Sequence, residues 1–172
     1  YVMGDRAIEE QPNKEEIADL AKLIGASVRE GAVGFSTNRL TVHVMPDGRP
    51  IPGTFATEEE LVQISKAVGQ EGGILQSVIQ GGDQLPAELA LIKKQLSAAQ
   101  TRLLFSAPWE PGEQGSNAYQ VAIDDMKANG LDVNGTTQPR AAAFLSGLQS
   151  NVLFSFRSKG SAWRELRSKN FE

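Results

Sequence analysis

Two hydrophobic patterns alternate along most of this chain. In four stretches, apolar residues recur every three or four positions, which predicts amphipathic helices. The first stretch follows Asn13 and ends at Gly31, and the second follows Thr57 and ends near Gly72. The third and fourth run over residues 86–96 and 117–129. Short apolar runs follow these stretches and predict strands over residues 32–36, 74–79, 102–106 and from 131.

Polar and special residues mark the predicted helix ends. Asn13 and Glu16 have the spacing of a capping box, as do Thr57 and Glu60. Pro86 suits the first turn of a helix, because that turn does not need its backbone N–H. Gly130 is typical of a residue just after a helix.

The alternation of helices and strands predicts the fold class. Apolar strands that alternate with amphipathic helices indicate an α/β fold, with a parallel sheet covered by helices. Because the strands read as near-continuously apolar, we expect them to be buried. Four strand–helix units are roughly half of a (β/α)8 TIM-type barrel, or a small open doubly wound sheet. Periodicity alone does not choose between the two.

Composition narrows the classes of protein. The chain has 172 residues, 40% of them hydrophobic and 22% charged, which predicts a single domain over residues 1–172. A net charge of -4, with both signs interspersed, favours neither nucleic acid nor a membrane surface as a partner. The absence of cysteine excludes disulfides and thiolate metal sites and is compatible with a cytoplasmic protein.

The two chain ends suggest a larger protein. The sequence begins at Tyr1 without an initiator methionine, and residues 161–172 contain no closing signal. We therefore expect an excised or truncated central part of a longer chain. The alternative is a complete domain trimmed at its ends.

Residues 34–56 carry the most chemical information. A short strand-like run opens into a long polar loop with three prolines and an Asp47–Gly48 turn, and the loop includes His43, the only histidine of the chain. In α/β barrels, loops at the carboxyl ends of the strands build the binding site.

This block, read with the segments on either side, resembles the N-acyl-D-amino-acid deacylases (D-aminoacylases) of the amidohydrolase superfamily. The residues that carry the resemblance are Val2–Ala7, Gly31–Thr37, His43, Asp47–Phe55, Glu60–Leu61, Gln138–Arg140, Leu145–Leu148 and Phe154. The resemblance implies a (β/α)8 barrel and zinc-dependent hydrolysis of the amide bond of N-acyl-D-amino acids. In that chemistry a metal polarises the carbonyl and activates water, and an aspartate moves protons.

The chain departs from the family pattern in its metal-binding residues. The family's His-x-His motif would lie upstream of Tyr1, and its last-strand aspartate downstream of Glu172. The predicted strand ends offer no histidine. We therefore expect zinc in the intact family protein and none in this chain alone, and we assign no catalytic residue.

Seven residues are candidates for contact with a small-molecule N-acyl amino acid: Asn38, Arg39, His43, Gln76, Trp109, Gln138 and Arg140. Each also has a structural interpretation. Asn38 would cap the strand end, Arg39 would form a surface salt bridge, and His43 would support a turn. Gln76, which shares a strand face with Gln80, would face a barrel interior. Trp109, beside the possible general base Glu110, would belong to a structural loop, and Arg140, after Gln138 and Pro139, would form a buried ion pair.

Three functions stay open at this point. The first is part of a metal-dependent amide hydrolase, inactive by itself. The second is a derived domain that binds small acylated ligands without turnover. The third is a self-associating domain, for instance a homodimer that forms through the exposed edges of a half-barrel sheet.

Overall fold

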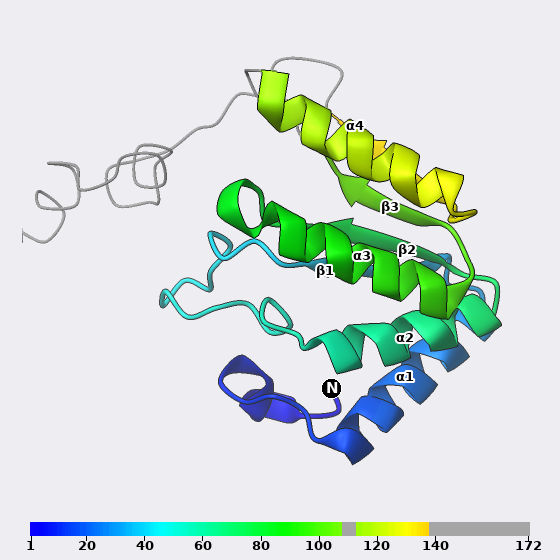
Figure 1. Cartoon of the computed structure of the whole chain (residues 1–172). Coiled ribbons are helices and arrows are strands. Elements are labelled where there is room, and N and C mark those ends of the chain that lie inside the picture. The colour runs from blue at the N-terminus through cyan, green and yellow to red at the C-terminus, as the bar shows by residue number, and fades with distance from the viewer. Residues whose placement is uncertain (108–112, 138–172) are drawn as a thin grey trace, which may run out of the picture. The chain divides into compact units, whose positions relative to one another are not determined.

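The computed structural model describes residues 1–107 and 113–137, which belong to one compact unit (Figure 1). The remaining residues lie outside the described part, so the expectation of a single domain over 1–172 stays a prediction. The elements in chain order are η1 (Gly4–Ile8), α1 (Lys14–Arg29), β1 (Gly34–Asn38), α2 (Glu58–Gln70), β2 (Ile74–Val78), η2 (Gly82–Gln84), α3 (Leu85–Ala99), β3 (Leu103–Ser106), α4 (Glu113–Ala128) and β4 (Val133–Thr136).

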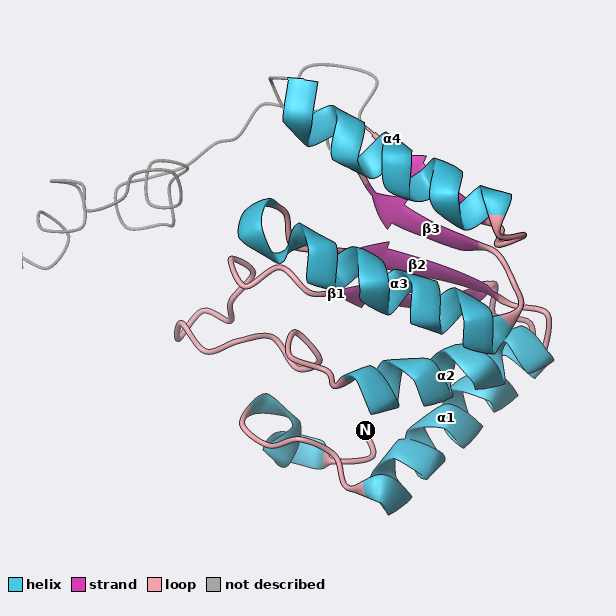
Figure 2. Ribbon diagram, viewed as in Figure 1, coloured by secondary structure: helices cyan, strands magenta, loops and turns pink. Residues whose placement is uncertain are grey.

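The four strands form one parallel sheet in the order β1-β2-β3-β4. The four α-helices all lie on the same side of this sheet (Figure 2). In a doubly wound sheet, helices cover both faces, whereas in a (β/α)8 barrel all helices lie outside the strands. The predicted α/β class is confirmed, and the one-sided arrangement is that of consecutive barrel units.

The hydrophobic core fills the space between the sheet and its helices. Leu75, Leu103, Phe105 and Val133 point into it and are almost completely buried. Helices α2 and α3 approach closely at Gly69, where an added Cβ would lie 1.8 Å from the carbonyl oxygen of Ala99. A side chain at position 69 would therefore push these helices apart.

The other face of the sheet corrects one expectation. We expected near-continuously apolar strands that are buried. Successive side chains instead alternate between a face that the helices cover and a second face. In the described part of the chain, no helix covers the second face. It carries polar side chains in most positions: Ser36, Asn38, Gln76, Ser106, Asn134 and Thr136. We call it the open face.

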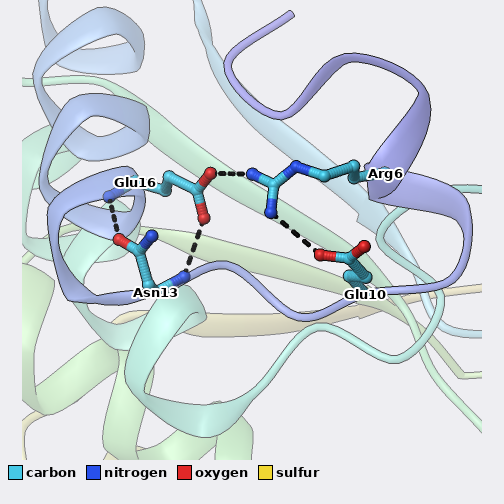
Figure 3. A network of polar contacts seen from close by, with 4 residues as sticks. All are labelled: Arg6, Glu10, Asn13 and Glu16. Atoms are coloured by element: carbon cyan, nitrogen blue, oxygen red, sulfur yellow. Dashed lines mark hydrogen bonds and ion pairs between the residues drawn. The ribbon is translucent and has the colours of Figure 1, made fainter.

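The start of α1 confirms the predicted capping box (Figure 3). The Glu16 backbone N–H donates to Asn13 Oδ1 at 3.0 Å, and the Asn13 backbone N–H donates to Glu16 Oε2 at 2.9 Å. Arg6 donates to both Glu16 and Glu10, which attaches η1 to the helix start. The hydrogen bond from the Asn13 backbone, with the nearby Arg6 guanidinium, lowers the pKa of the Glu16 carboxyl.

Several element boundaries differ from the predicted ones by one to four residues, among them those of β1 and α4. Strand β1 covers residues 34–38 rather than 32–36, because its extent is set by pairing with β2, and Asn38 still has Val78 as its partner. Helix α4 begins at Glu113, four residues earlier than predicted. The weak helix formers Gly115 and Ser116 are tolerated there, since propensity costs at most about 1 kcal/mol per residue. None of the helices in the described residues is long and apolar enough to cross a membrane.

Candidate functional site

Polar side chains of the open face gather toward the carboxyl ends of the strands. The strand register aligns Asn38 with Val78 and Ser106 with Thr136, which forms the row nearest this end. The next row contains Ser36, Gln76, Leu104 and Asn134. The carboxyl end of a barrel sheet is where such enzymes place their sites. The long loop between β1 and α2 extends from the same end (Figure 1).

Gln76 is hydrogen-bonded on the open face. Its Oε1 accepts a hydrogen bond from the Ser36 hydroxyl of the neighbouring strand. Gln80 lies two residues beyond the end of β2, and its Nε2 donates to Thr41 Oγ1 at 2.8 Å. One glutamine thus links two strands, and the other attaches the loop to the end of β2.

Asn38 holds the start of the same loop. Its Oδ1 accepts from the Leu40 backbone N–H at 2.9 Å, and its Nδ2 contacts Nδ1 of His43. The His43 backbone N–H donates to the Leu40 carbonyl at 3.2 Å. The His43 side chain is exposed at the carboxyl end of the sheet.

Arg39 belongs to the other side of the sheet. Its Nε donates to both carboxylate oxygens of Glu88 on α3, at 3.0 and 2.9 Å, and its Nη1 donates to the Ala56 carbonyl at 2.9 Å. The Arg39 and Glu88 side chains are only 17% and 9% exposed. This ion pair is therefore buried rather than on the surface, and it joins the end of β1, the end of the loop and the start of α3.

The middle of the loop has its own internal support. The Met45 backbone N–H donates to the Arg49 carbonyl at 2.8 Å, and Val44 bridges Pro50 in antiparallel fashion. Gly48 adopts φ +87° in the connecting turn, a conformation that favours glycine. The side-chain hydrogen bond from Arg49 lowers the pKa of the exposed Asp47 carboxyl.

A cavity of about 260 Å3 lies beside the edge strand β1. Its lining includes Phe35, Asn38, Thr54, Glu60 and Leu61. Burial raises the pKa of the Glu60 carboxyl, although the Thr57 backbone and Arg39 act in the opposite direction. The cavity therefore combines apolar walls with one carboxyl group in partly desolvated surroundings.

The structure brings together some of the predicted site residues. Asn38, His43 and Gln76 lie at the carboxyl end or on the open face, whereas Arg39 is engaged with Glu88. Trp109, Glu110, Gln138 and Arg140 lie outside the described residues. Substrate contact by any of the seven candidates stays a prediction.

Sequence reasoning missed Glu88 and Glu60. Glu88 occurs at helical spacing with the buried residues Leu85, Ile92 and Gln95 of α3. A carboxylate within an apolar stripe requires a partner, so the sequence at this position could have predicted a buried ion pair. Glu60 carried no comparable signal, because the cavity that it lines is formed together with residues of the preceding loop and of β1.

The described residues do not fit a zinc site. Within residues 1–107 and 113–137, no three histidine, cysteine, aspartate or glutamate side chains come together in a way that could hold a metal ion. A protein zinc site needs three or four such ligands. Residues beyond the described ranges would have to supply them.

Comparison with known proteins shows which solved structures share this fold. No family model and no curated protein matches the sequence. A structure of D-aminoacylase, described for the functional role of its binuclear metal centre, matches with a TM-score of 0.65 and 19% identity. The chain has the fold of part of a D-aminoacylase. The match covers 81% of this chain and 28% of that one.

Two further D-aminoacylase structures match over the same shares of each chain. One is a point mutant in complex with 100 mM copper chloride, with a TM-score of 0.64 and 19% identity. The other defines a novel subset of amidohydrolases, with a TM-score of 0.62 and 18% identity. At this identity the likeness concerns the fold alone, and the resemblance found in the sequence is confirmed at that level.

Proposed function

We propose that this chain is part of a metal-dependent hydrolase that cleaves the amide bond of N-acyl-D-amino acids. The observation that carries the proposal is the structural match to D-aminoacylases over 81% of the chain. The polar residues toward the carboxyl ends of β1 to β4 support it, because this end of a barrel sheet is where a substrate would bind. A cytoplasmic location is part of the same proposal and is supported by the absence of cysteine.

In this proposal the chain contributes part of the substrate-binding wall and not the metal centre. Asn38, His43 and Gln76 would present hydrogen-bonding groups to an N-acyl amino acid. Zinc, which the sequence resemblance implies, would be held by residues from other parts of a longer protein and would activate the attacking water. The described residues do not form a metal site, so we assign them no role in holding the metal or in its chemistry.

The test compares this chain with the protein encoded by the longest open reading frame around it. We expect zinc by elemental analysis, and release of free D-amino acid from an N-acetyl-D-amino acid, only for the longer protein. Metal and turnover in neither protein would contradict the proposal. Full activity of the 172-residue chain would contradict the proposal that other parts of a longer protein supply the metal centre.

A specific observation also favours self-association as a second function. Strands β1 and β4 form the two edges of the sheet, and in the described part of the chain each has a neighbour on one side only. Two copies related by a two-fold axis could pair β1 of one with β4 of the other and enclose the open faces. Light scattering at increasing concentration tests this. A dimer supports the second function, and a monomer at high concentration with a cooperative melt contradicts it.

A further inference from the structure

The side-chain amide of Asn38 has a defined orientation. Its Oδ1 accepts a hydrogen bond from the Leu40 backbone N–H at 2.9 Å. A backbone N–H only donates, so the atom that faces it must be the amide oxygen and not the nitrogen. The other end of the amide, which contacts His43, is therefore the NH2 group.

This orientation determines where His43 carries its proton. The Asn38 amide nitrogen contacts Nδ1 of the imidazole ring. Since an NH2 group only donates, Nδ1 must offer a lone pair. A neutral imidazole has one N–H, which must then be on Nε2.

Two tethers keep the ring in this arrangement. The His43 backbone N–H closes a turn onto the Leu40 carbonyl at 3.2 Å. Gln80 holds Thr41, two residues before the histidine, at the end of β2. The loop segment 40–43 is thus attached to Asn38 at the end of β1 and to Gln80 just after β2, and this limits the positions that the ring beside Asn38 can take.

We propose that Asn38 is a positioning residue that holds His43 as the neutral Nε2–H tautomer, so that His43 meets its ligand as a hydrogen-bond donor. The ligand atom that accepts such a bond is a carboxylate or carbonyl oxygen, and an N-acyl amino acid has both. The identity of the ligand rests on the proposed function, whereas the tautomer does not. The same arrangement disfavours zinc ligation through Nε2, because a metal needs the lone pair that the proton occupies.

The tautomer is measurable in the 172-residue chain, where His43 is the only histidine. Long-range 1H–15N correlation spectra of uniformly 15N-labelled protein distinguish a protonated from an unprotonated ring nitrogen. At about pH 8.5, where histidine is ordinarily neutral, we expect an unprotonated Nδ1 and a protonated Nε2. A protonated Nδ1, or the averaged shifts of a free imidazole, would overturn the assignment without any variant.

Substitution at position 38 tests whether Asn38 determines the tautomer of His43. In Asn38→Asp a carboxylate accepts from both Leu40 and the ring, so we expect the proton to move to Nδ1. In Asn38→Ala we expect the averaged shifts of an unconstrained histidine. Asn134→Asp is the matched control, because Asn134 lies on the same open face of the sheet but on β4. It should leave the His43 spectrum unchanged. If Asn38→Asp keeps the wild-type pattern and the wild-type fold by circular dichroism, Asn38 does not position the ring.

The ligand is tested in the longer protein with N-acetyl-D-alanine as the probe. We expect the 15N resonance of His43 Nε2 to shift on addition of the probe, with the proton retained. Hydrolysis of the probe without such a shift would overturn the ligand assignment alone. Absence of hydrolysis would contradict the proposed function and leave the tautomer result intact, so the two failures are distinguishable.

Discussion

On β3, Phe105 lies under the helices and is fully buried, whereas its neighbours Leu104 and Ser106 lie on the open face and are half-buried. The same contrast runs across the sheet, with Leu75 and Val133 on the covered face and Gln76 and Asn134 on the open one. The covered face forms a core from this chain's own helices. The open face has polar groups in place of a core, which suits a wall that faces ligand or another part of a protein.

This contrast implies that stability and function depend on alternate residues of the same strands. A change on the covered face removes packing that the helices supply. A change on the open face removes a hydrogen bond or a ligand contact and little packing. Four predictions test how sharply the two faces differ.

The largest effect is expected for Phe105→Ala. Truncating a fully buried aromatic side chain loses its transfer free energy and leaves a cavity, at a cost of about 3–5 kcal/mol in the free energy of unfolding. Leu104→Ala, one residue away on the open face, should cost less than about 1 kcal/mol, closer to a surface change. Urea denaturation of both variants measures the difference. Equal losses would mean that the open face is packed as tightly as the covered one.

The next effect concerns the buried ion pair. Glu88→Ala leaves the Arg39 guanidinium without its carboxylate in a largely buried position, and we expect a loss of about 3 kcal/mol. The control is Glu58→Ala, which breaks the exposed ion pair with Lys94 and should cost about 0–1 kcal/mol. Thermal or urea unfolding compares the two. Similar small losses would show that the Arg39–Glu88 pair adds little to the attachment of the loop.

The next prediction compares two serines, of which only one should lose stability on truncation to alanine. Ser77 lies on the covered face at 1% exposure, and its hydroxyl has no hydrogen-bond partner among the described residues. Ser77→Ala should therefore leave stability unchanged or raise it, by up to about 1 kcal/mol. Ser36→Ala removes the bond to Gln76 on the open face and should cost about 0.5–1.5 kcal/mol. A clear loss for Ser77→Ala would reveal a partner for its hydroxyl.

The smallest effect is a difference in pH dependence between two glutamates that each occupy the third position of a helix. Burial raises the Glu60 pKa above 4.5, so its contribution to stability is present below that pH and is lost as pH rises through the folded-state value. The Asn13 hydrogen bond lowers the Glu16 pKa below 4.5, so its contribution is present above that pH and is lost as pH falls.

Unfolding curves at a series of pH values between about 3 and 7 measure this difference. Relative to the wild type, Glu60→Gln should gain stability as pH rises, and Glu16→Gln should gain it as pH falls. Parallel curves for both variants would contradict the opposite pKa shifts.

Local signals in the sequence were sufficient for the elements. The Asn13–Glu16 capping box, the apolar spacing in α1 to α3 and Gly130 after α4 act through contacts within a few residues. Helical spacing and short apolar runs then determined the parallel α/β class. The resemblance carried by the loop block pointed to the D-aminoacylase fold.

Only the tertiary structure decided which strand residues form each face and what the loop side chains contact. Asn38 and Arg39 are adjacent in sequence, yet one positions His43 and the other forms a buried pair with Glu88, 49 residues away. The extent of β1 depends on the register with β2, and the raised pKa of Glu60 depends on its burial in the folded chain. Periodicity reports which residues share a side of an element, but partners distant in sequence are brought together only when the elements pack.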